Sequence, residues 1–196
     1  MSRVEQSYEP AYTIDMAVNI KLYEFELTEL DPEHVTQNII EFMQENLALS
    51  NMSNVQAWHS SYQTHHLTDR FDSVIQAMML RISKIPDYPG TTMLFPIDSW
   101  AIVYKKNDWT KVHDHGFAAY SCVYYPDVDA DSAPVIFLDN TQTIKIQPKK
   151  NHLLVFPGYV QHCVPKSKTD KLRIAYSANF TVIPKIYNDP NVRKFK

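Results

Sequence analysis

Three histidines in two separated stretches of the sequence have the residue type and spacing of a metal site. His113 and His115 lie two residues apart in the segment His-Asp-His-Gly, and His162 follows much later, between apolar stretches. In an extended backbone, residues two apart point to the same side, so both imidazoles of the pair can converge on one point. Because neutral imidazole is a good ligand for Fe, Zn, Cu or Ni, the three side chains predict a metal site with open coordination positions.

An arginine follows at a position that suits an anion. Arg173 opens the last apolar segment of the chain, eleven residues after His162. The side chains that share its face of the segment are small, namely Ala175, Ser177 and Asn179, and such a face is expected to line a cavity. A guanidinium there can hold a carboxylate through two hydrogen bonds, which would fix a small diacid beside the metal.

The segments that must position these residues are short and rich in Val, Ile, Tyr and Phe. They predict strands at 97–105, 116–125, 134–138, 142–147, 152–156, 160–164 and 172–183. The apolar residues between Ala17 and Leu27 alternate and then change phase, which predicts an earlier strand with a bulge near Leu22.

Two amphipathic helices are expected before the main run of strands. Asp31-Pro32 supplies a helix cap and a first-turn proline, and apolar residues recur at helical spacing after it. A second helix is expected after Thr68, with an apolar stripe from Phe71 to Ile82. Helices followed by closely spaced strands favour a mainly β structure of two sheets with the helices packed on one outer face.

Length and composition set limits on the class of protein. A chain of 196 residues is expected to form a single domain, 1–196, and its net charge of −3 makes a nucleic-acid partner an unfavourable interpretation. No apolar run approaches the roughly 20 residues that span a bilayer, and the start lacks the core of a signal peptide. Cys122 and Cys163 lie in apolar stretches, so buried, reduced thiols and a cytoplasmic location are expected, while an oligomer stays open.

Several motifs, in this order, resemble those of the iron and 2-oxoglutarate-dependent oxygenases, in a branch related to prolyl hydroxylases. They are Ser-Trp-Ala-Ile-Val-Tyr-Lys-Lys from Ser99, His-Asp-His, Ser-Cys-Val-Tyr-Tyr, Val-Phe-Pro with His162, and Arg-Ile-Ala-Tyr-Ser-Ala-Asn-Phe from Arg173. Trp58 and the segment from Tyr62 to Leu67 extend the likeness. The resemblance implies a double-stranded β-helix, or jelly roll, with a catalytic core at about 92–184 and a supporting N-terminal part at about 12–90.

The resemblance also implies roles for the residues singled out above. His113, His115 and His162 would bind Fe(II), and Arg173 would bind the distal carboxylate of 2-oxoglutarate. The implied reaction uses dioxygen to decarboxylate 2-oxoglutarate to succinate and CO2 and to hydroxylate an unidentified substrate, either a protein side chain or a small metabolite.

The chain departs from the wider superfamily at two positions. His115 stands where Asp or Glu is usual, and a neutral ligand there leaves an extra positive charge on the metal centre. Asp114 is no expected substitute, because strand alternation should point it away from both histidines.

The second departure is Ala175, which stands where a serine hydroxyl is common. The lost hydrogen bond to the cosubstrate, on the order of 1 kcal/mol, could come from Ser177, Tyr104 or Tyr120 instead.

The remaining histidines and the alternatives complete the predictions. His34 and His59 are expected on the surface, and His65 and His66 in a loop or at a helix entry. The segments 87–98 and 126–133 are expected to choose the substrate. Two other functions stay open: a three-histidine cupin-type dioxygenase that needs no 2-oxoacid, and a non-catalytic jelly-roll binding module.

Overall fold

The computed structural model describes residues 12–16, 20–47, 54–90, 92–138 and 142–184. Within these residues the strands are β1 (Tyr12–Met16), β2 (Ile20–Glu26), β3 (Val55–Gln56), β4 (Trp58–His59), β5 (Thr92–Tyr104), β6 (Trp109–His113), β7 (Tyr120–Asp127), β8 (Val135–Leu138), β9 (Thr143–Ile146), β10 (His152–Pro157), β11 (Gln161–Val164) and β12 (Arg173–Pro184). They form a seven-stranded sheet in the order β1-β2-β10-β7-β12-β5-β4 and a five-stranded sheet in the order β3-β6-β11-β8-β9. The predicted fold of two sheets is confirmed.

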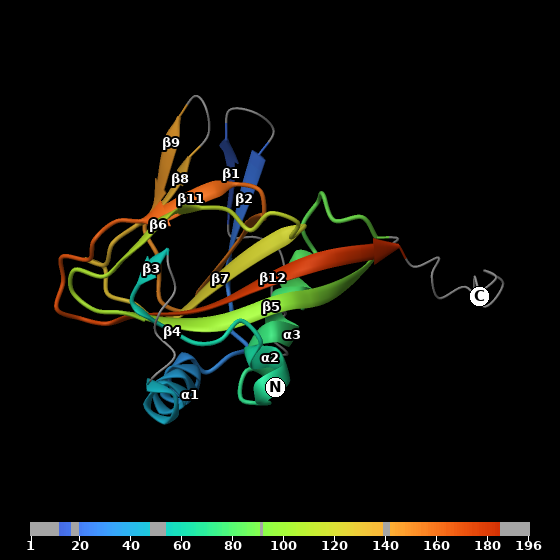
Figure 1. Cartoon of the computed structure of the whole chain (residues 1–196). Helices are drawn as coiled ribbons and strands as arrows, with labels where there is room; N and C mark the ends of the chain where they lie inside the picture. Colours follow the sequence, from blue (N-terminus) through green and yellow to red (C-terminus); the bar gives the residue numbers. More distant parts are fainter. Residues whose placement is uncertain (1–11, 17–19, 48–53, 91, 139–141, 185–196) are drawn as a thin grey trace, which may run out of the picture.

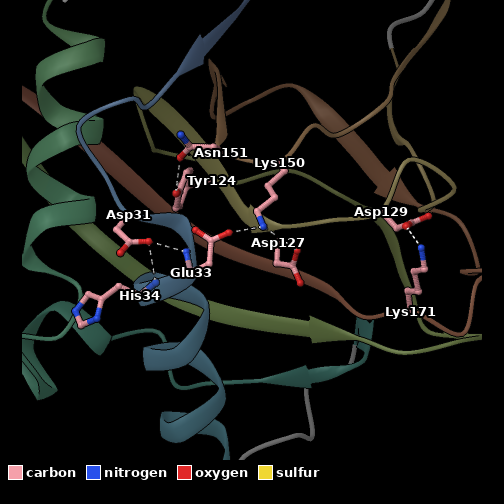
Figure 2. Close-up of polar contacts among 9 residues, drawn as sticks. All are labelled: Asp31, Glu33, His34, Tyr124, Asp127, Asp129, Lys150, Asn151 and Lys171. Atoms are coloured by element: carbon pink, nitrogen blue, oxygen red, sulfur yellow. Dashed lines mark hydrogen bonds and ion pairs between the residues drawn. The ribbon is translucent and has the colours of Figure 1, made fainter.

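The helices are α1 (Pro32–Glu45), α2 (Thr64–Leu67) and α3 (Asp72–Ile82). Asp31 caps α1 as predicted, since its carboxylate accepts hydrogen bonds from the backbone amides of Glu33 and His34 at 3.0 and 3.3 Å (Figure 2). The short helix α2 was not predicted. None of the helices in the described part of the chain combines the length and the apolar character that crossing a membrane requires.

The two predicted helices, α1 and α3, lie on one side of the larger sheet as expected, and α2 lies on the same side (Figure 1). Apolar side chains of α1 and α3 share one buried cluster with the sheet residues that face them. Phe71 is central, because its ring lies 5.8 Å from that of Phe42 on α1 and 4.6 Å from that of Tyr176 on β12. Burying this outer face leaves the inner face of the sheet to form the site.

A polar connection joins α1 to the turn that precedes β10 (Figure 2). Glu33 pairs with Lys150 at 2.8 Å, and the Tyr124 hydroxyl donates to the side chain of Asn151 at 2.8 Å. Asn151 adopts the left-handed conformation, with φ 62°, which asparagine tolerates better than most residues. The ion pair is exposed and contributes about 1 kcal/mol at most, so the buried contacts hold the helix in place.

The strand expected at 17–27 is β2, without the predicted bulge, although residues 17–19 lie outside the described part. Its pairing with β1 runs in unbroken register. The apolar phase changes because both faces of β2 are buried: Leu22 packs between the sheets, whereas Tyr23 and Phe25 pack towards the helices. The seven later strands appear within a few residues of their predicted bounds, whereas the sequence did not predict β1, β3, β4 and β6.

Candidate active site

The three predicted histidines meet at one point on the inner face of the smaller sheet. His113 ends β6 and lies directly across from His162 on β11 in the strand register, and His115 follows in the loop after β6. Their potential ligand nitrogens all lie within 4.8 Å of one another. The ring centroid of His113 lies 4.3 Å from that of His162 and 5.1 Å from that of His115. Three imidazoles this close can hold one ion.

Two of these rings are fixed by backbone carbonyls. Nδ1 of His113 lies 2.9 Å from the carbonyl oxygen of Lys111, and Nδ1 of His162 lies 3.0 Å from that of Val160. A carbonyl can only accept, so Nδ1 carries the proton in both rings and Nε2 keeps its lone pair. This donor set fits a metal ion.

Burial favours the neutral form of two of the imidazoles, those of His162 and His115. It lowers the pKa of His162 to about 3, and the nearby rings of His113 and His115 add to the effect. Burial also lowers the pKa of His115 to about 3, with a further contribution from His113. Neutral imidazole is the form that binds metals.

The loop that carries His115 is held by a close backbone approach. The amide of His115 donates to the carbonyl of Gly158 at 2.8 Å. A Cβ atom on Gly158 would lie 2.3 Å from the carbonyl oxygen of Ala118, so only glycine fits there. The side chain of Asp114 accepts a hydrogen bond from the amide of Gly116 at 3.0 Å, which stabilises the same turn.

Arg173 lines the same pocket as the histidines, with 3% of its surface exposed. Its guanidinium donates to the carbonyl oxygen of Ala133 at 3.2 Å and to the hydroxyl of Tyr125 at 3.3 Å, and both acceptors are neutral. Its Nε atom is buried and has no hydrogen-bond partner in the described part of the chain. A buried cation with neutral partners favours an anionic ligand.

Two tyrosines surround this guanidinium. The rings of Tyr104 and Tyr125 lie 5.0 and 5.2 Å from it. Burial raises the pKa of both phenols, with Arg173 acting in the opposite direction, so both hydroxyls stay protonated. The hydroxyl of Tyr104 is engaged with Thr110 at 2.7 Å. The hydroxyl of Tyr125 can donate its proton to a ligand of Arg173.

Tyr120, which the sequence offered as a further hydroxyl donor, lies away from these groups. It packs against the outer cluster, with its ring 6.4 Å from that of Tyr88. Strand alternation explains the difference, because Tyr120 shares a face of β7 with Cys122 and Tyr124, whereas Tyr125 faces the pocket. Because side chains alternate along a strand, assigning Tyr120 and Tyr124 to the outer face would have placed Tyr125 on the pocket face. Ser177, in contrast, lines the pocket.

One wall of the pocket is aromatic. The ring of Trp100 stacks on that of His59 at 5.8 Å and lies 5.2 Å from Tyr62 and 5.6 Å from His115. The predicted surface position of His59 is wrong, since only 1% of it is exposed, and burial lowers its pKa to about 4. A lone histidine gave no sequence signal for this, because β4 is only two residues long.

The predictions for the cysteines and for the remaining histidines are confirmed only in part. Cys122 is buried, but Cys163 is only partly buried, and both are free thiols. His34 is exposed on α1 as predicted, and His65 and His66 form part of α2.

Exposed aromatic residues lie in two loops next to the histidine-bearing strands, and an ion pair ties a further loop to β12. Phe117, two residues after His115, is fully exposed, and 61% of Tyr159 is exposed. The loop after β7 is tied to the start of β12 by an ion pair between Asp129 and Lys171 (Figure 2). Of the segments expected to choose the substrate, much of 87–98 belongs to β5 instead.

No family model matches the chain, and no curated protein matches its sequence. Solved structures do match. A prolyl hydroxylase from Trichoplax adhaerens, in complex with a peptide fragment of hypoxia inducible factor, superimposes with a TM-score of 0.65 at 13% identity, covering 81% of this chain and 82% of that one. HygX from Streptomyces hygroscopicus, with nickel and 2-oxoglutarate bound, gives 0.60 at 6% identity, covering 81% and 82%.

A third similar structure is SnoN, a non-haem α-ketoglutarate-dependent epimerase from nogalamycin biosynthesis. It gives a TM-score of 0.62 at 13% identity, and the match covers 89% of this chain and 86% of that one. At these identities the likeness concerns the fold. The chain has the double-stranded β-helix fold that prolyl hydroxylases and other iron and 2-oxoglutarate oxygenases share.

Proposed function

We propose that this protein is a non-haem Fe(II), 2-oxoglutarate-dependent dioxygenase that hydroxylates an unidentified substrate and releases succinate and CO2. The observation that carries the proposal is that one pocket holds both three converging imidazoles and a buried guanidinium whose partners are neutral. The first group suits a divalent transition metal, and the second suits a carboxylate.

In this proposal His113, His115 and His162 hold the metal. Bound Fe(II) would supply the activation of dioxygen, for which three protein ligands leave coordination positions open. The protein contributes rings whose protonation is set by burial and by backbone carbonyls. Three neutral ligands leave the full charge of the ion in place, so an anionic cosubstrate is favoured beside it.

Arg173 binds the distal carboxylate of 2-oxoglutarate, and its neighbours assist. Tyr104 and Tyr125 pack against the guanidinium and limit its rotation, and Tyr125 donates a hydroxyl proton to the same carboxylate. Ser177, on the face of β12 that Arg173 opens, supplies a polar hydroxyl between Arg173 and the histidines.

The substrate enters beside the aromatic wall. Tyr62, which is 38% exposed, and Trp100 form an apolar surface next to His115 that excludes water and orients an apolar portion of the substrate. A protein side chain and a small metabolite are both compatible with this mouth. The similar structures span both, since one contains a peptide and another belongs to the biosynthesis of nogalamycin.

Turnover of 2-oxoglutarate tests the proposal. Iron-loaded protein incubated with 2-oxoglutarate under air is expected to yield succinate and CO2 at a slow rate without the primary substrate, measured by NMR and by release of labelled CO2. Arg173→Ala should abolish this turnover, and Arg70→Ala, which alters a partly exposed arginine paired with Glu45, should not. Equal turnover in the two variants, or none in the wild type with any loaded metal, would contradict the proposal.

A cupin-type dioxygenase that needs no 2-oxoacid is the second candidate, and the specific observation in its favour is the third histidine, His115, in place of a carboxylate. This candidate assigns no cosubstrate to Arg173. Unchanged 2-oxoglutarate affinity in Arg173→Ala, together with bound iron, would favour it over the first. Purified protein that retains no metal would instead favour a non-catalytic binding module.

A further inference from the structure

The three histidines are not held in the same way. Backbone carbonyls, which can only accept hydrogen bonds, fix the tautomers of His113 and His162. Nδ1 of His115 instead lies 3.4 Å from the side-chain amide nitrogen of Asn179. The tautomer of this one ring therefore depends on a side chain that carries both a donor and an acceptor.

Asn179 is itself held from the neighbouring strand. It is 6% exposed and lies directly across from Ser121 in the register between β12 and β7. The hydroxyl of Ser121, which is 1% exposed, donates to Oδ1 of Asn179 at 2.8 Å. The amide thus spans from a buried hydroxyl to the His115 ring.

This orientation of the amide is incompatible with coordination through Nε2 of His115. When Nδ2 of Asn179 donates to Nδ1 of His115, the neutral ring must carry its proton on Nε2. Rotating the amide by half a turn exchanges two groups of equal size. Oδ1 then accepts from Nδ1–H of His115, and Nδ2 donates to the hydroxyl of Ser121, which can accept as readily as it donates. The number of hydrogen bonds does not change.

We infer that Asn179, anchored by Ser121, is a positioning residue that selects the metal-binding tautomer of His115. The inference rests on the proposed metal-binding function of the three histidines. In the metal-bound protein the amide carbonyl faces His115, so that Nε2 of the ring points its lone pair at the ion. Groups that hold the second nitrogen of a ligating histidine commonly change metal affinity by about 10- to 100-fold when removed.

Two substitutions of Asn179 separate this role from packing. Asn179→Asp keeps the shape and can only accept, so it should bind Co(II) at least as tightly as the wild type. Asn179→Leu keeps a similar volume without a polar atom, and should bind Co(II) about 10- to 100-fold more weakly. Asn46→Leu at the C-terminal cap of α1, where the amide donates to the carbonyl of Phe42, is the matched control and should leave Co(II) affinity unchanged.

Affinities are measured by chelator competition, with the Co(II) absorption spectrum and histidine ¹⁵N shifts of the Zn(II) form as direct reports of coordination and tautomer. The expected result is recovery in Asn179→Asp and loss in Asn179→Leu, with His115 protonated on Nδ1 in the Zn(II) form. Affinity within twofold of the wild type in Asn179→Leu, or equal losses in both variants, would overturn the inference while leaving the proposed function intact. A wild-type protein that binds no metal would overturn both.

Discussion

Replacing Arg173 is expected to weaken 2-oxoglutarate binding by an amount that the structure bounds. The guanidinium is 3% exposed, so solvent screens its interaction with a carboxylate only weakly. Removing one partner of a buried, hydrogen-bonded charge pair costs about 2–5 kcal/mol, so Arg173→Ala should raise the Kd by about 30- to 4,000-fold. Arg173→Lys keeps the charge but loses one of two charge-assisted hydrogen bonds, which corresponds to about 10- to 150-fold.

The assay is isothermal titration of 2-oxoglutarate into Mn(II)-loaded protein without oxygen. Each variant is first shown to retain its circular dichroism spectrum and its Mn(II) affinity, so that a loss of folding is not taken for a loss of binding. Arg70→Ala, which removes a partly exposed side chain paired with Glu45, should leave the Kd unchanged. A folded, metal-loaded Arg173→Ala protein that binds 2-oxoglutarate within threefold of the wild type would refute the assignment of this arginine.

Three further outcomes are expected. Tyr125→Phe removes the hydroxyl that lies 3.3 Å from the Arg173 guanidinium, so it should weaken 2-oxoglutarate binding by about two- to tenfold in the same titration. Tyr120→Phe should leave the binding unchanged, because Tyr120 packs against Tyr88 instead. Equal effects of the two substitutions would contradict the assignment of Tyr125 to the pocket. Gly158→Ala should lower metal affinity and cost about 1–3 kcal/mol of unfolding free energy, while Gly90→Ala, whose Cβ meets nothing within 4 Å, should not. His59 of the metal-free protein has a pKa of about 4 when folded and an ordinary pKa of 6.5, so between these pH values it takes up a proton on unfolding. Its contribution to stability is therefore fully present above about pH 6.5 and is lost as the pH falls towards 4. His59→Gln should reduce this loss by about 2 kcal/mol at about pH 5 in urea titrations, and an unchanged pH dependence would show that the ring is not buried as described.

The strands and helices that bury one regular face could be predicted from the sequence. The helix α1 carries its own cap and apolar spacing, and β12 shows which face is small and polar. The strand β6 could not be predicted, because only one of its five residues is buried and two of them are exposed. The bulge predicted in β2 was wrong for a different reason. Because β2 is buried on both faces, its apolar residues do not alternate with polar ones, and the change of phase in the sequence reflects this burial.

The convergence of the three histidines followed from type and spacing, whereas their surroundings did not. The wall of Trp100 and His59 depends on a two-residue strand pairing at the sheet edge, which leaves no periodic signal. The identity of the tyrosine beside Arg173 depended on strand phase, which the tyrosine-rich segment from Tyr120 to Tyr125 obscured. Tertiary pairing decides such details, and local sequence does not encode them.

The strand β12 is hydrogen-bonded along both of its edges, to β5 on one side and to β7 on the other. Arg173, Ser177 and Asn179 therefore lie on one stiff element whose amides should exchange with solvent among the slowest in the protein. The mouth residues Tyr62 and Trp100 belong to other segments of the chain. Laboratory selection for a new substrate can accordingly vary the mouth while the groups proposed to bind cosubstrate and metal keep their spacing.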